Sequence, residues 1–116
     1  MPPKVAAGAP VPIAIRIGNT SGRPVELHLQ GRVTVFDLTV SRGDAVLWRR
    51  LEGESVPAIL QLRVLAPGEV LELKDTWRQV DNAGGRVAPG EYSVSGEIPT
   101  DGVPLRVGPV PLTIGG

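Results

Sequence analysis

The chain contains no cysteine, one histidine and only four aromatic residues in a length of 116. Without cysteine it can form neither a disulfide framework nor a thiolate zinc site. A single histidine also gives a transition metal too few of its preferred ligands. We therefore expect no metal and no cofactor, and the lack of disulfides fits a reducing cytoplasm.

The chain also lacks an excess of charge and any long apolar run. Twelve basic and twelve acidic residues cancel at pH 7. Nucleic acid or an anionic membrane surface would require a basic excess, so we expect neither as a partner. Residues 1–10 hold no apolar stretch of signal-peptide length, and no segment approaches a transmembrane span. The sequence predicts a cytoplasmic protein, unless a signal peptide has been removed.

Helical periodicity is hard to find, whereas alternating apolar and polar residues recur between turn signals spaced about 8–12 residues apart. Within 33–40 the apolar phase shifts by one residue at Phe36, which predicts a bulge or a change of sheet. Pro109 and Pro111 remove ladder donors and predict that the last strand is an edge. The expected strands cover residues 13–17, 25–29, 33–40, 45–50, 58–65, 70–77, 92–98 and 105–114.

Two Ala-Pro-Gly-Glu segments, 66–69 and 88–91, each precede a strand. Proline fixes φ at one turn position and glycine tolerates a positive φ at the next, so both predict type II turns. Tyr92 follows the second segment in a Gly-x-Tyr pattern that resembles a tyrosine corner. These features predict one all-β domain at 11–116, an immunoglobulin-like antiparallel β-sandwich of about 7–8 strands, after a flexible segment at 1–10. A closed barrel is the alternative.

No residue receives a catalytic, cofactor-binding or metal-binding assignment. His28 lies between two leucines and is expected to face solvent, and the chain has no Gly-x-Ser-x-Gly nucleophile elbow. Residues 81–85 resemble a fragment of a calcium loop, but a plain turn is favoured because the repeated acidic spacing is missing. Phe36 and Trp48 are expected in the core rather than on a ligand platform, while Trp77 at a strand end fits either place. We expect no enzymatic activity.

Several motifs follow one another along the chain, namely Asn19-Thr20-Ser21, Val35–Val40, Val46–Arg49, Ala58–Leu60, Leu65–Glu69, Trp77 and Pro89–Tyr92. Their order resembles that of the BsuPI family of intracellular proteinase inhibitors. The similarity extends over about residues 11 to 98, and the ordered set is more specific than any single motif. The sequence departs from the family pattern at Arg49-Arg50-Leu51, where a polar, serine-bearing segment and an aromatic residue are common, and in its longer tail after Ile98.

The resemblance implies an immunoglobulin-like sandwich that inhibits a bacterial intracellular serine protease of the subtilisin type. Such an inhibitor holds an extended loop rigid, so that little ordering entropy is lost on binding. No strand pattern explains residues 51–57, and an ordinary surface loop is the alternative there. The residues expected to contact the protease are Leu51, Glu52, Gly53, Glu54 and Ser55.

A second hypothesis is an immunoglobulin-like interaction or assembly module without inhibitory activity, since this fold serves many unrelated roles. In that case the partner is another protein, and the segment 5–17 is the candidate for strand addition to a neighbour's sheet edge. Both hypotheses leave the oligomeric state open.

Overall fold

The computed structural model describes residues 1–30, 35–53, 60–100 and 103–115. These residues form nine strands, slightly more than the sequence predicted, and none of them lies in a helix. The predicted all-β fold is confirmed. The strands are β1 (Lys4–Ala6), β2 (Val11–Gly18), β3 (Val25–Gln30), β4 (Asp37–Arg42), β5 (Ala45–Arg49), β6 (Leu60–Leu65), β7 (Val70–Trp77), β8 (Gly90–Ile98) and β9 (Leu105–Gly115).

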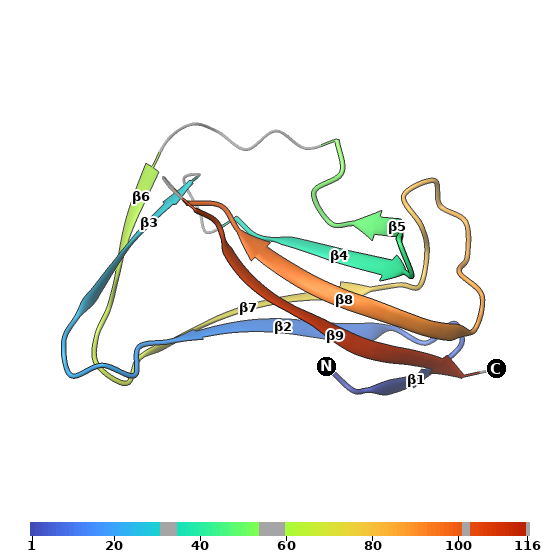
Figure 1. Ribbon diagram of the computed structural model, residues 1–116, viewed down its shortest axis with the longest axis horizontal. Helices are drawn as coiled ribbons and strands as arrows, with labels where there is room; N and C mark the ends of the chain where they lie inside the picture. The colour runs from blue at the N-terminus through green and yellow to red at the C-terminus, as the bar shows by residue number, and fades with distance from the viewer. Residues whose placement is uncertain (31–34, 54–59, 101–102, 116) are drawn as a thin grey trace.

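Two layers of unequal size form a sandwich (Figure 1). The larger sheet has the order β1-β9-β8-β4-β5, in which β1 runs parallel to β9 and the other neighbours are antiparallel. β2 and β7 form an antiparallel pair that lies along this sheet. β3 and β6 form a second antiparallel pair, which continues the first as a ribbon and extends past the larger sheet (Figure 1). The molecule is therefore elongated, with extents of 47 × 29 × 22 Å.

Alternation of apolar and polar residues builds the facing layers. β2 buries Val11, Ile13 and Ile15, while Pro12 is exposed, Ala14 is half-buried and Arg16, which follows Ile15, is exposed. β8 keeps the same alternation over its whole length. Because successive side chains of a strand point to opposite faces, each layer presents one apolar face to the other.

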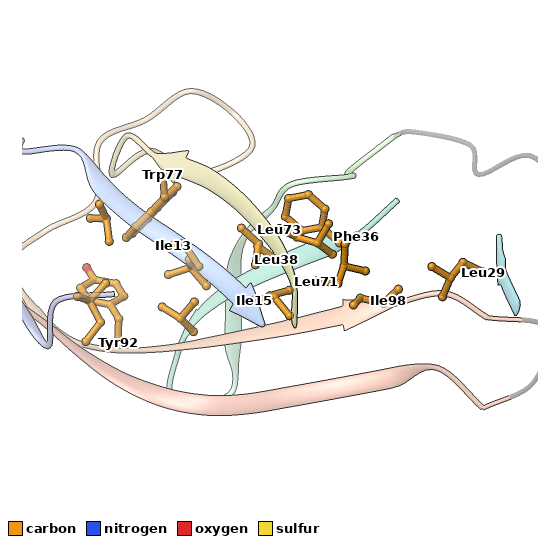
Figure 2. Packing of buried hydrophobic residues seen from close by; sticks show 14 of the residues in the cluster. Ile13, Ile15, Leu29, Phe36, Leu38, Leu71, Leu73, Trp77, Tyr92 and Ile98 are labelled. Carbon is orange, nitrogen blue, oxygen red and sulfur yellow. The ribbon is translucent and has the colours of Figure 1, made fainter. Parts of the chain in front are cut away.

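Trp77 and Tyr92 lie at one end of the core between the layers, and Phe36 lies away from them towards Ile98 (Figure 2). Trp77 is 1% exposed, and its ring centroid lies 6.2 Å from those of both Trp48 and Tyr92. Its Nε1–H donates to the Val80 carbonyl at 2.9 Å, so the polar edge of the indole is satisfied. Phe36 is buried and Trp48 half-buried, as predicted, and Trp77 belongs to the core as well.

The two Ala-Pro-Gly-Glu segments adopt different conformations. At 66–69 the Glu69 N–H donates to the Ala66 carbonyl at 2.9 Å and Gly68 has a φ of +79°, which confirms the type II turn. At 88–91 the φ of Gly90 is +152°, outside the type II range, and this glycine already belongs to β8. The Ala88 carbonyl accepts the Tyr92 hydroxyl instead. The tyrosine corner thus replaces the turn hydrogen bond that the sequence predicted.

A hydrogen-bond network around Asn19 joins the β2–β7 pair to the β3–β6 pair. Its side-chain Nδ2 donates to the carbonyls of Leu65, at 2.9 Å, and Arg23, at 2.6 Å, and its Oδ1 accepts the Ser21 N–H at 3.0 Å. Its backbone N–H donates to the Glu69 carbonyl at 3.0 Å. Because Asn19 is buried, these bonds satisfy a side chain that would otherwise be costly to desolvate. They fix the point at which β2 leads into β3 and β6 into β7.

The β3–β6 pair departs from the predicted pattern of burial. Leu62 and Val64, the residues that suggested the strand in β6, are 58% and 46% exposed, and Leu65 is buried in their place. The β3–β6 pair has only two strands and extends past the larger sheet, so its outer face lies against no other layer of the described residues. The pattern located the strand correctly but not its buried face.

The shift of phase at Phe36 is present, since Phe36, Leu38 and Val40 are all buried. Residues 33 and 34, on which the predicted bulge also depends, lie outside the described residues. Residues 58 and 59, the predicted start of β6, do so too.

The two ends of the chain lie side by side. Residues 1–10 were expected to form a flexible segment, but they include β1, which pairs with β9 from Lys4↔Thr113 to Ala6↔Gly115. β9 is therefore flanked by β8 and β1 at its C-terminal end. Over 105–112 its pairs within the described residues are with β8 alone, so the predicted edge exists along this part.

Candidate functional site

The chain that leaves β5 forms a tight turn at Leu51–Gly53. The Leu51 N–H donates to Asp37 Oδ1 at 3.0 Å, and the Glu52 N–H donates to the Arg49 carbonyl at 3.3 Å. Gly53 follows with a φ of +75°, which glycine adopts without steric cost. Leu51 is half-buried, whereas Glu52 and Gly53 are exposed. Of the five predicted contact residues these three are brought together in one turn; Glu54 and Ser55 lie outside the described residues.

Arg50 anchors this turn to both layers. Its Nε donates to Asp75 Oδ2 of β7 at 2.6 Å, and its Nη1 donates to the Phe36 carbonyl at 2.8 Å. The guanidinium carbon lies 4.0 Å from the centre of the Phe36 ring. The Arg50 N–H donates to the Leu38 carbonyl at 2.9 Å, which continues the ladder of β4 past the end of β5. The backbone that enters the candidate loop is therefore fixed by several independent contacts.

The electrostatics of Asp75 favour this anchor. Partial burial raises the pKa of its carboxyl group, but the Thr76 N–H and the hydrogen bond and charge of Arg50 outweigh burial and hold the pKa below its ordinary value. The Thr76 N–H donates to Asp75 Oδ1 at 2.7 Å. Asp75 is thus a carboxylate at neutral pH, and the pair with Arg50 is charged. Sequence reasoning missed Arg50, whose only signal was the departure from the family pattern at Arg49-Arg50-Leu51.

Residues 81–85 form the predicted turn and also cover the edge of β5. Asp81 Oδ1 accepts the N–H groups of Ala83 and Gly85, both at 2.9 Å. The Asn82 side chain bonds both backbone groups of Arg49, accepting from its N–H at 2.8 Å and donating to its carbonyl at 3.0 Å. Asn82 thus occupies backbone groups at the edge of β5 that a neighbouring strand would otherwise use.

Neither the histidine nor the acidic residues considered in the sequence form a metal site among the described residues. His28 is exposed, as predicted, with Nε2 3.7 Å from a carboxylate oxygen of Glu26. Within 1–30, 35–53, 60–100 and 103–115, no group of three or more His, Cys, Asp or Glu is placed to hold a metal ion. None of the described residues belongs to a helix able to span a membrane.

The segment 5–17, the candidate for strand addition to a neighbour, is already paired within the molecule. Val5 and Ala6 pair with β9, and residues 11–17 pair with β7. Assembly through this segment would therefore use the free edge of β1 or β2, each of which has one neighbour in the described sheets, or an exchange of these pairings between copies.

The chain matches a model of a known protein family. A family model described as BsuPI, intracellular proteinase inhibitor, matches residues 4–103. The match includes all strands from β1 to β8 and the whole candidate loop. Among curated proteins, no sequence matches the chain.

Proposed function

Because the chain belongs to the BsuPI family of intracellular proteinase inhibitors, we propose that it is a non-enzymatic, cytoplasmic protein that binds and blocks a serine protease of the subtilisin type. The partner is a protein, and no cofactor takes part. The loop that begins at Leu51 makes the contact.

The anchored turn at Leu51–Gly53 is the observation that supports this contact surface. An inhibitor must present a segment that enters a protease site without unfolding or losing much conformational entropy. Arg50, bonded to Asp75 and to the Phe36 carbonyl, holds the start of this segment against both layers. A protein interface of standard size that forms with little backbone movement requires exposed residues on a fixed backbone, as in this turn.

The chemistry of the turn also fits a contact surface. Leu51 offers an apolar side chain that is half-buried in the free protein, and Glu52 next to it is exposed. Neither side chain appears in the core cluster or in a described ion pair. Replacing both side chains should therefore leave the fold intact and change only what the loop presents.

The test is a titration of the purified protein into a subtilisin-type intracellular serine protease, with hydrolysis of a peptide substrate as the signal. We expect stoichiometric inhibition, while mass spectrometry shows that the added protein stays intact. The double variant Leu51→Ala/Glu52→Ala should weaken inhibition by about tenfold or more, the loss typical of residues central to an interface.

The matched control is Asp44→Ala/Val46→Ala, an exposed acidic and apolar pair at the β4–β5 hairpin. It should inhibit like the unaltered protein. Equal inhibition by both double variants would exclude this loop as the contact. Unchanged protease activity, or digestion of the added protein, would contradict the inhibitor function itself and favour the interaction module.

A further inference from the structure

A cavity of about 260 Å³ lies where the turn after β1 meets the segment that follows β7. Two arginines, Arg78 and Arg86, line it together with Val80 and Val87. None of these residues belongs to the proposed contact loop, and they have no part in the proposed function.

A short antiparallel ladder carries the two arginines. The Val87 N–H donates to the Gln79 carbonyl at 3.1 Å, and Val80 and Arg86 form a β-bridge. Arg78 precedes the first of these contacts and Arg86 takes part in the second. The backbones of both arginines are therefore held in a fixed relation to each other.

Gln79 locks this ladder to the turn after β1. Its side chain is buried, Nε2 donates to the carbonyls of Ala6 at 2.9 Å and Ala9 at 2.7 Å, and Oε1 accepts the Gly8 N–H at 3.0 Å. Its φ is +59°, a conformation that residues other than glycine adopt at a cost. Such strain persists only where surrounding contacts impose it, and it is concentrated at binding sites.

The charges of Arg78 and Arg86 are not compensated within the described residues. Both side chains are exposed, and neither takes part in a described hydrogen bond or ion pair, whereas Arg16, Arg50 and Arg106 each have a carboxylate partner. The nearby Asp81 already uses Oδ1 to hold its own turn. Both arginines line one cavity, so an anion bound there would be attracted by two positive charges.

We propose that Arg78 and Arg86 form a binding site for an oxyanion, a carboxylate or a phosphate group. A guanidinium presents a planar set of N–H donors that matches both groups, and charge-assisted hydrogen bonds of this kind are the strong ones. The cavity is smaller than a typical drug-sized pocket, so it takes a single group with a short apolar stem against Val80 and Val87. The group comes from a free small anion or from an acidic side chain of a partner protein.

The first experiment titrates isotope-labelled protein at constant ionic strength and follows amide and arginine Nε–H signals by NMR. The probes are inorganic phosphate, succinate, a short Asp-containing peptide and its Asn analogue. We expect saturable shifts at Gly8, Gln79 and Val87 with the anions and none with the Asn peptide. If the Asp peptide binds more tightly than succinate, the source is a partner protein; equal or weaker binding identifies a small anion.

Arg78→Gln and Arg86→Gln should each weaken binding by about tenfold, the loss expected for one charge-assisted hydrogen-bonding partner. Arg23→Gln, at an exposed arginine in the loop between β2 and β3, is the matched control and should bind like the unaltered protein. If the shifts never saturate, or if the binding affinity falls equally in all three variants, the proposed site is wrong.

A second measurement does not depend on how the variants fold. Phenylglyoxal modifies accessible arginines of the unaltered protein, and peptide mass spectrometry locates the modification. Phosphate should protect Arg78 and Arg86 but leave Arg23 reactive. Equal modification of all three with and without phosphate would contradict the proposal. Neither experiment involves a protease, so its result is independent of the inhibitor test.

Discussion

Tyr92 links the aromatic end of the core to the chain that enters β8. Its ring is buried against Trp77, its hydroxyl donates to the Ala88 carbonyl, and the Arg42 guanidinium lies 5.5 Å from the ring centre. One side chain therefore combines apolar packing with a hydrogen bond that fixes the bend before the strand.

Tyr92→Phe should remove this hydrogen bond and keep the packing. We expect the free energy of unfolding to fall by about 1 kcal/mol, the usual net value of one hydrogen bond. Urea unfolding followed by tryptophan fluorescence measures the change. If the variant is as stable as the unaltered protein, the hydrogen bond from the Tyr92 hydroxyl to Ala88 contributes no more stability than a hydrogen bond from that hydroxyl to water.

The ion pair of Asp75 with Arg50 makes the free energy of unfolding depend on pH in the acid range. Its pKa in the folded protein is held below the ordinary value. The stabilisation is therefore fully present above the pKa of the unfolded chain, about 4, and is lost as the pH falls through the lower folded-state pKa. Since the Asp75 side chain is 38% exposed, solvent screens the pair and keeps its contribution modest.

Asp75→Asn should therefore lower stability at pH 7 by up to about 1 kcal/mol, with the difference from the unaltered protein shrinking below about pH 4. Urea unfolding from pH 7 to pH 2 measures this. Glu72→Gln is the matched control: hydrogen bonds from Lys74 and Arg16 lower the pKa of Glu72 too, but the side chains of both cations are 69% exposed, against 29% for Arg50, so solvent screens them more and a smaller effect is expected. A constant difference across the pH range would contradict the pair's role.

At the scale of elements, the two-stranded layer leaves β2 with β7 as its sole neighbour in the described sheets. Pro12 lies in β2 opposite Thr76 and has no N–H to offer. Pro111 in β9 acts likewise. Prolines on edge strands reduce pairing with other chains, while Asn82 covers part of the β5 edge with its side chain.

Pro12→Val should restore a donor on the β2 edge together with a residue that favours strands. We expect the mean mass in sedimentation equilibrium to rise with concentration towards that of a dimer. Pro10→Val, just outside the strand, is the control and should behave like the unaltered protein. If both variants give the same mass at every concentration, Pro12 does not protect the edge.

At the scale of the whole molecule, the two proposed binding regions use different residues, although the turn at 81–85 connects them through the bonds of Asn82 to Arg49. The turn at Leu51–Gly53 is tied to the start of β4 and to β7, whereas the arginine cavity lies against the turn after β1. No residue is shared between the two regions as described. Because the two regions have no described residue in common, each can be tested with its own variants.

The sequence by itself determined the all-β class, most strand positions and the first type II turn. Each depends on local properties: alternation over a few residues, and the φ preferences of proline and glycine. The buried faces of β2 and β8 followed from the same short-range patterns, whereas the family was indicated by the order of the motifs along the chain. The tyrosine corner was also visible, because its two ends lie only four residues apart.

Only the tertiary structure decided which apolar faces are covered and which polar residues meet. Leu62 and Val64 alternate like core residues, but their exposure depends on where the larger sheet ends. Arg50 meets Asp75, Asn82 meets Arg49, and Gln79 meets the turn after β1 across long separations in sequence. Such contacts depend on how the layers stack and on backbone groups that no strand has paired, and neither property is encoded in a local pattern.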